Sequence, residues 1–327
     1  ILFRKLNLLE PMNSIISSGN KSDYLMDQDT VSQSSSFRLA AKLKDYLLLV
    51  KFNLSFMVVF SAVVSYLLAP MVTGFDLQAI VLLFVGGMLV TGSANAINQA
   101  LEKDTDAMMK RTAGRPVAAG RMTVAEAMAF ATICGLAGVM LLWHFNFLTA
   151  ALSLFSLFFY AFIYTPLKKV SSVAVLAGAI PGAMPCLIGW AAGNDSLSAG
   201  GWILFALQFF WQFPHFWAIA WLAHKDYSAA GFKLLPSGEG QTKYSALQAV
   251  IYSLVLLPVG VMPYFNGMSG VISLFVVLIA NLFMVGTCVR LYLDMTGKAA
   301  RRVMFGSYIY LPVVLLALLI DKVHVLN

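Results

Sequence analysis

The sequence predicts an all-α protein, an integral membrane bundle of nine transmembrane helices with a cytoplasmic N-terminus and a C-terminus outside. Of the 327 residues, 60% are hydrophobic and only 11% are charged, whereas a soluble domain carries about 25% charged residues. Long charge-free runs alternate with short basic segments. The net charge of +7 comes from basic residues scattered between apolar runs, a pattern that indicates a membrane rather than nucleic acid as the partner.

The start of the chain differs from the rest. Residues 1–37 are polar, rich in serine and without hydrophobic periodicity. We therefore expect residues 1–40 to be a disordered cytoplasmic tail and residues 41–327 to be one nine-helix transmembrane domain. Acidic residues outnumber basic ones in residues 1–37, whereas a mitochondrial targeting segment is rich in arginine and poor in acid. We expect a bacterial inner membrane rather than the mitochondrial inner membrane.

The charge-free runs locate the nine spans. A transmembrane helix needs about 20 residues. The runs 127–167 and 244–289 are long enough for two spans each, and each has a turn signal near its middle, at 143–146 and 263–267. Five further runs hold one span each: 52–75, 77–101, 170–194, 196–224 and 303–320.

The basic residues test this count of spans. With nine spans, every Lys and Arg except Lys322 falls on the same side of the membrane. By the positive-inside rule that side is cytoplasmic. No Asp, Glu, Lys or Arg lies at the centre of a span, whereas ion-coupled transporters place ionisable groups there. Any chemistry is therefore expected at the cytoplasmic helix ends.

A first acidic cluster ends the span 77–101. Asn98, Glu102, Asp106 and Lys110 are spaced by four residues, which places them along one face of a continuous helix. Oxygen ligands in this arrangement suit Mg²⁺, which is usually shared with substrate phosphates. A second interpretation is equally compatible with these residues: a solvated helix end whose carboxylates pair with Lys103 and Lys110.

The residues around this cluster refine the expectation. Asp104 lies off the acidic face, so we expect it to be solvated. Gly114 and Pro116 end the helix and allow Arg111 and Arg115 to fold back over the cluster. In a membrane protein such a basic run is ordinarily only a topology signal.

A second acidic cluster follows the span 196–224, four spans after the first. It consists of Asp226 with His224 and Lys225, and the offset suggests a duplicated bundle whose halves face each other across a cavity. His215 lies deeper in the span, beside Pro214 and among tryptophans and phenylalanines. It is either a hydrogen-bonded helix contact or part of a pocket for a flat macrocycle.

Together these motifs resemble the UbiA-type intramembrane aromatic prenyltransferases, and within them the protohaem IX farnesyltransferase family. The motifs that carry the resemblance follow one another in order after residue 40: Asn98-x-x-x-Glu102-x-x-x-Asp106, Arg111-Thr112-x-x-Arg115-Pro116, 164–169, 182–190, 211–217, 226–236 and 300–311. The chain departs from the pattern at position 102, where the family more often has Asp. In the second cluster only Asp226 is a clear carboxylate.

The resemblance implies that farnesyl diphosphate is the donor, haem B the acceptor and haem O the product, with Mg²⁺ as cofactor. It implies a catalytic set around the diphosphate, of which the last three residues are the metal ligands: Asn98, Glu102, Asp106 and Asp226. It implies four basic diphosphate-binding residues: Arg111, Arg115, Lys168 and Lys225. We expect His215 to contact haem.

The same resemblance implies partners, and two alternative functions stay open. Besides both substrates we expect membrane lipid, no nucleic acid, and a downstream haem A synthase or terminal oxidase assembly as recipient of the product. One alternative is a prenyltransferase acting on an aromatic quinone precursor, which acceptor competition distinguishes. An alternative of another class is a membrane transporter or lipid-binding protein, which lacks Mg²⁺-dependent release of diphosphate.

Overall fold

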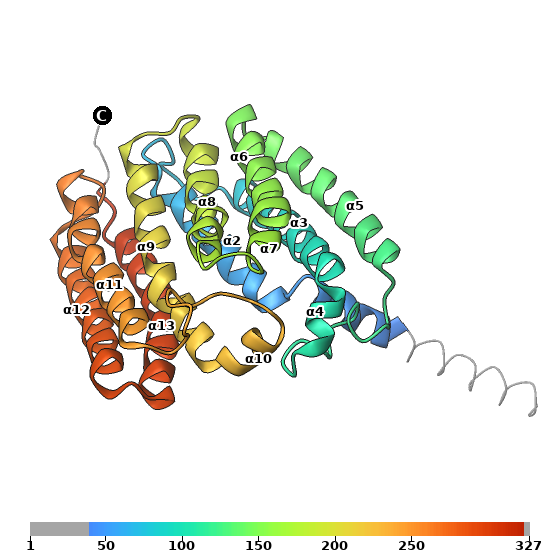
Figure 1. Cartoon of the computed structure of the whole chain (residues 1–327). Coiled ribbons are helices and arrows are strands. Elements are labelled where there is room, and N and C mark those ends of the chain that lie inside the picture. Colours follow the sequence, from blue (N-terminus) through green and yellow to red (C-terminus); the bar gives the residue numbers. More distant parts are fainter. Residues whose placement is uncertain (1–38, 324–327) are drawn as a thin grey trace, which may run out of the picture. The chain divides into compact units, whose positions relative to one another are not determined.

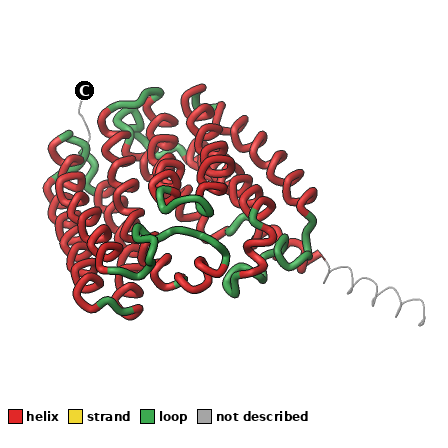
Figure 2. The backbone as a smooth tube through the Cα atoms, viewed as in Figure 1, coloured by secondary structure: helices red, strands yellow, loops and turns green. Residues whose placement is uncertain are grey.

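Each long apolar run forms a long helix. The computed structural model describes residues 39–323, and all regular structure in that range is helical (Figure 2). The helices are Leu39–Leu49, α2 (Phe52–Leu68), α3 (Leu77–Leu101), α4 (Lys103–Met108), α5 (Val124–Trp143), α6 (Phe147–Phe158), the π-helix η1 (Phe159–Tyr164), α7 (Thr165–Leu167), α8 (Ala174–Asn194), α9 (Ala199–Leu222), α10 (His224–Ala229), α11 (Lys243–Phe265), α12 (Val271–Asp294) and α13 (Gly297–Ile320).

The helix count agrees with the sequence. Within residues 39–323, eight helices are long and apolar enough to cross a membrane, and the number is nine if Leu39–Leu49 and Phe52–Leu68 form one bent span. Both expected hairpins are present, with turns between α5 and α6 and between α11 and α12. The all-α membrane fold is confirmed. The direction in which the bundle crosses the membrane stays a prediction.

The expected disordered tail lies almost wholly outside the described residues. Of residues 1–40 only Leu39 and Ala40 are described, and both are helical. From Leu47 onward the described residues form one compact unit. The helices extend past the charge-free runs: α13 begins at Gly297 and so includes Lys298 and Arg301, because long basic side chains reach water from the end of a membrane helix.

Helix α8 lies at the centre of this unit, packed against α2, α6 and α9. It is built from small residues and most of its length is buried. Gly189 shows why: a Cβ atom there would collide with the backbone carbonyl of Ala62 on α2. A close approach of two helix backbones is what small residues permit inside a membrane. Together with α8, the helices α2, α3 and α6 surround one interior space.

Lys322, the basic residue that breaks the charge pattern, has a structural role. Its Nζ donates hydrogen bonds to the carbonyl oxygens of Leu67, Ala69 and Val72 at 2.7, 2.9 and 2.8 Å. It therefore caps the C-terminal end of α2, where carbonyls lack helical partners. Burial lowers the pKa of Lys322 below its usual range. This capping role explains why Lys322 lies at that end of the bundle, away from the other basic residues.

The ends of α3 and α9, which the expected duplication would pair, have the same backbone geometry. Helix α3 ends at Glu102 with φ −101° and ψ 14°, and α9 ends at Ala223 with φ −98° and ψ 16°. A helix of six residues follows each break, α4 and α10. Both lie at the same end of the bundle, which we call the α4/α10 end (Figure 1). The second break carries Ala223 where the first carries Glu102, so the second half has fewer carboxylates.

Candidate active site

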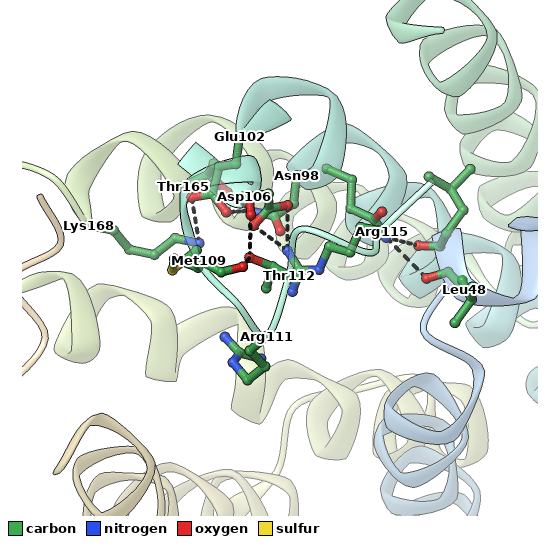
Figure 3. Close-up of polar contacts among 12 residues, drawn as sticks. Leu48, Asn98, Glu102, Asp106, Met109, Arg111, Thr112, Arg115, Thr165 and Lys168 are labelled. Carbon is green, nitrogen blue, oxygen red and sulfur yellow. Dashed lines mark hydrogen bonds and ion pairs between the residues drawn. The ribbon is translucent and has the colours of Figure 1, made fainter. Parts of the chain in front are cut away.

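Two buried carboxylates form the centre of the α4/α10 end. Glu102 and Asp106 are 4% and 1% exposed. Lys168 Nζ lies 2.8 Å from Glu102 Oε1, and Arg115 NH1 lies 2.7 and 2.6 Å from the two oxygens of Asp106. Figure 3 shows both carboxylates between these two cations. Buried charges of this kind persist only when they are paired.

These partners differ from those that a solvated, salt-bridged helix end would have. A salt-bridged helix end would pair the carboxylates with Lys103 and Lys110, but both lysines are exposed. The actual partners come from the loop after α4 and from the segment after α7. Asp104 is exposed, as expected. The prediction of one continuous helical face is wrong in one respect. The helix is interrupted at Glu102, and Lys110 lies beyond the end of α4.

Arg115 folds back through the turns that follow α4. Thr112 Oγ1 donates a hydrogen bond to the Asp106 carbonyl at 2.8 Å, and the Arg115 amide donates to the Thr112 carbonyl at 2.9 Å. The expected return of the basic run is therefore present for Arg115. Arg111 points elsewhere: its guanidinium donates to the hydroxyl of Tyr227 at 3.0 Å.

Asn98 and Thr165 complete the polar wall. Asn98 Nδ2 donates to Glu102 Oε2 at 2.9 Å and to Thr165 Oγ1 at 3.2 Å. The amide nitrogen is thereby fixed, because a carboxylate oxygen only accepts, and Asn98 Oδ1 takes no part in these two bonds. Thr165 Oγ1 in turn donates to the carbonyl of Tyr160 at 2.9 Å. This bond lies along the π-helix η1, which is followed directly by Thr165 and then by Pro166, and such wide turns often occur at functional sites.

The oxygen atoms of this wall fit Mg²⁺. Glu102 Oε1 is buried without a hydrogen bond, because Lys168 approaches it out of hydrogen-bond alignment. Hard oxygen ligands are what Mg²⁺ prefers, and it usually binds one or two carboxylates plus substrate phosphates. Among the described residues no three His, Cys, Asp or Glu side chains lie close enough together to hold one metal ion. Asp226 is therefore not assembled with Glu102 and Asp106 around a single ion.

The second cluster lies beside the first. The hydrogen bond from Arg111 to Tyr227 joins the loop after α4 to α10, the helix that carries Asp226. Beneath it, Met109 packs with Ala230 and Phe232 in one apolar cluster. Asp226 is half-buried and Lys225 is exposed. The carboxylate of Asp226 has neither an ion pair nor a hydrogen bond within residues 39–323.

Two aromatic residues and one lysine of this site were missed in the sequence. Lys168 lies over the ring of Tyr164 at 4.7 Å and over that of Phe232 at 5.6 Å, so cation–π contacts hold it in place. In the sequence, Lys51 is only one of the basic residues that indicate the cytoplasmic side. In the structure it interacts electrostatically with both ion pairs. Lys51 precedes α2 and has a left-handed backbone, with φ 49°.

An apolar cavity of about 110 Å³ lies in the bundle among α2, α3, α5, α6, η1 and α8. Asn95 and Tyr160 line it near the acidic cluster, and Leu83 and Leu142 line it further along. From Leu83 to Asn95, α3 covers about 18 Å at 1.5 Å per residue. The cavity therefore starts within one helical turn of Asn98 and continues towards the middle of the bundle.

His215 lies deep on α9 in an aromatic surround and is 8% exposed. Its ring stacks on Trp211 with centroids 4.9 Å apart, and Tyr308 meets it edge-on at 5.2 Å. His215 Nδ1 is 2.7 Å from Ser307 Oγ, which donates its own hydrogen to the carbonyl of Met304 at 2.6 Å. The Ser307 oxygen must therefore accept from the histidine. In the neutral ring the hydrogen therefore lies on Nδ1, and Nε2 keeps a lone pair.

Several known proteins are similar to this chain in sequence or in fold. Residues 58–310 match the UbiA prenyltransferase family. A protohaem IX farnesyltransferase of Cytophaga hutchinsonii is 43% identical over 287 residues, which cover 88% of this chain and all of that protein. A solved digeranylgeranylglyceryl phosphate synthase superposes with a TM-score of 0.72 at 20% identity, covering 86% of this chain and 98% of the other. A UbiA homologue of Archaeoglobus fulgidus, bound to GPP and Mg²⁺, gives 0.59 at 15% identity, covering 82% and 99%.

Fold, site and likeness together define an intramembrane prenyltransferase, and the chain belongs to the UbiA prenyltransferase family. Within that family it groups with proteins named protohaem IX farnesyltransferase. The chain is therefore an enzyme, and the interpretation as a transporter or lipid carrier is wrong.

Proposed function

We propose that this enzyme transfers the farnesyl group of farnesyl diphosphate to a vinyl group of haem B to make haem O, at the cytoplasmic face of a bacterial inner membrane. The observation that carries the proposal is a pair of buried, cation-paired carboxylates just beyond the turns of α3 that line an apolar cavity. The relatives named protohaem IX farnesyltransferase support the choice of acceptor. The side to which the α4/α10 end faces rests on the positive-inside rule.

The acidic residues are proposed to hold Mg²⁺ against the diphosphate. Asn98, Glu102 and Asp106 supply oxygens from one side, and Asp226 supplies a carboxylate from α10 on the other. The two sides meet through the diphosphate rather than around one ion. The related A. fulgidus protein bound to GPP and Mg²⁺ supports this choice of metal. When bound, the metal neutralises charge on the departing diphosphate.

The basic residues are proposed to stabilise the leaving group. Arg115 and Lys168 already lie at the carboxylates, so they need only change partner when a diphosphate arrives. The planar guanidinium fork suits phosphate oxygens. Arg111, placed at the junction with α10, and the exposed Lys225 are assigned to the outer side of the same group.

The reaction forms one carbon–carbon bond. The C1–O bond of farnesyl diphosphate breaks and its electron pair leaves with the diphosphate oxygen. The vinyl group of haem donates its π electrons to C1, and water adds to the resulting haem cation and loses a proton, which gives the hydroxyethylfarnesyl arm. The ring faces of Tyr160 and Tyr164 beside the cluster can stabilise positive charge during this step.

The apolar cavity is proposed to hold the farnesyl chain. It begins next to Asn98 and is lined almost wholly by carbon, so the diphosphate would remain at the polar entrance while the isoprene units lie inside. Thr91 lies in its wall on α3, seven residues and therefore about 10 Å from Asn98.

The Thr91→Phe substitution is expected to shorten the accepted donor. Activity with farnesyl diphosphate should fall about tenfold or more, as is typical when a pocket no longer fits part of its substrate, while activity with geranyl diphosphate is retained. Competition between the two donors, read by mass spectrometry of the product, measures the ratio. Thr132→Phe, on the exposed face of α5, is the matched control. An unchanged donor ratio in Thr91→Phe would mean that the farnesyl chain lies elsewhere in the protein.

His215 is proposed to bind the haem iron through Nε2, since the Ser307 contact leaves that nitrogen with a lone pair. His215→Ala should weaken binding of ferric haem by about tenfold or more and remove the Soret shift caused by histidine ligation. Ser307→Ala should weaken it by a smaller factor, because the ring loses the partner that orients it. His144→Ala, in the turn between α5 and α6, should leave the titration unchanged. Equal haem affinity in His215→Ala and the wild type would remove the residue from the site.

The acceptor is tested by competition. Purified enzyme in detergent, supplied with farnesyl diphosphate, Mg²⁺, haem B and a hydroxybenzoate, should prenylate haem and yield haem O by mass analysis. Prenylation of the hydroxybenzoate alone would instead establish the quinone-precursor alternative. The product leaves within the membrane, where a downstream haem A synthase or terminal oxidase assembly would receive it.

A further inference from the structure

Lys51 stands between the helix Leu39–Leu49 and α2, in a left-handed backbone conformation. Its φ of 49° and ψ of 58° fall in the region that favours glycine and that long side chains rarely adopt. A bulky residue keeps such a conformation only where its surroundings hold it, and functional sites are where this most often happens.

Two amide side chains of α3 hold this break. Gln99 Nε2 donates to the carbonyl oxygens of Leu48 and Leu49 at 3.1 and 2.8 Å. Asn95 Nδ2 donates to the carbonyl of Val50 at 3.1 Å. These are carbonyls that lose their helical partners where the first helix ends. Both amides come from the turns of α3 that lead into the acidic cluster, and Leu48 lies on the side where Arg115 enters it (Figure 3).

The clamped backbone brings a third cation to two carboxylates that already have partners. Lys51 is half-buried and interacts electrostatically with the Glu102–Lys168 and Asp106–Arg115 pairs. In the described part of the chain no carboxylate lies within ion-pair distance of Lys51. Lys51 is therefore a third basic group beside two carboxylates that are already paired, and its partly buried ammonium is unfavourable until an anion reaches it.

We propose that Lys51 binds the diphosphate of the prenyl donor directly. The inference rests on the proposed diphosphate site and adds to it a residue from the start of α2, on the side of Arg115. An ammonium is a compact point charge that suits phosphate oxygens without a fixed direction. As the C1–O bond breaks, its electron pair moves onto the departing diphosphate, and the ammonium stabilises that charge.

Lys51→Gly separates this role from a structural one. Glycine adopts the left-handed backbone without strain, so the variant should unfold at the same temperature as the wild type or higher. Its affinity for inorganic pyrophosphate with Mg²⁺ should nevertheless fall about tenfold or more, because a charge-assisted contact is lost, and KM for farnesyl diphosphate should rise. Lys51→Arg should recover part of the affinity, and Lys51→Asn, which tolerates this backbone, is the second neutral variant.

Asp195→Gly is the matched control, since Asp195 is exposed and has φ 50° at the end of α8. It should leave pyrophosphate binding unchanged. Wild-type affinity in both Lys51→Gly and Lys51→Asn would overturn the inference and leave the proposed function intact. No Mg²⁺-dependent pyrophosphate binding by the wild type would overturn both. Loss of haem binding with intact pyrophosphate binding would assign Lys51 to the acceptor and contradict the inference.

Discussion

Replacing Asp106 with asparagine is expected to lower the rate of haem O formation about a hundredfold or more, the loss typical when one preorganised charge contact is removed from a developing charge. The carboxylate is 1% exposed and both of its oxygens contact Arg115. Asparagine keeps the shape and removes the charge, so Mg²⁺ loses a ligand. The measurement is the initial rate in detergent at several Mg²⁺ concentrations.

Asp104→Asn is the control for this substitution. Asp104 lies two residues away on α4 and is exposed, so its replacement makes the same change in net charge outside the site. Its rate should stay within about twofold of the wild type, since surface substitutions away from partners have small effects. If Asp106→Asn kept the wild-type rate, or if both variants lost activity alike, the metal assignment would be wrong.

The Asp226→Asn substitution should cost a similar factor, about a hundredfold, but without any loss of stability. The Asp226 carboxylate has no ion pair or hydrogen bond within residues 39–323, so asparagine removes no stabilising contact from the free enzyme. The expected signature is an unchanged unfolding temperature together with a higher Mg²⁺ requirement. Thermal unfolding and the Mg²⁺ dependence of the rate are measured on the same preparation.

Glu239→Gln tests whether any carboxylate in this loop would give the same result. Glu239 is exposed in the segment between α10 and α11 and should have wild-type activity. A wild-type Mg²⁺ dependence in Asp226→Asn would mean that α10 takes no part in binding the diphosphate. The first acidic cluster would then account for the metal alone.

The helices could be predicted because apolar length and charge are local properties of the sequence. The run 77–101 coincides with α3, and the turn signals in the two long runs lie at the turns between helices. Prediction failed where helix ends extend through charged residues, as at the start of α13. A charge marks the edge of the apolar layer, not the last hydrogen bond of a helix.

The site was predictable in residue type but not in its contacts. Spacing by four correctly brought Asn98 to Glu102, but no local signal indicates that Glu102 pairs with Lys168, which lies far along the chain. That choice depends on how α3 packs near α7. The break at Glu102 and the left-handed backbone of Lys51 also depend on distant partners, so both stayed hidden in the sequence.

The proposed mechanism depends on one diphosphate that is held from two sides, by the end of α3 with α4 and by α10. Binding of Mn²⁺ in place of Mg²⁺, followed by electron paramagnetic resonance with a non-reactive farnesyl diphosphate analogue, tests this most directly. We predict that the wild type binds Mn²⁺ tightly only with the analogue, and that Asp106→Asn and Asp226→Asn each lose this binding. Analogue-dependent Mn²⁺ binding of wild-type strength in either variant would contradict the account.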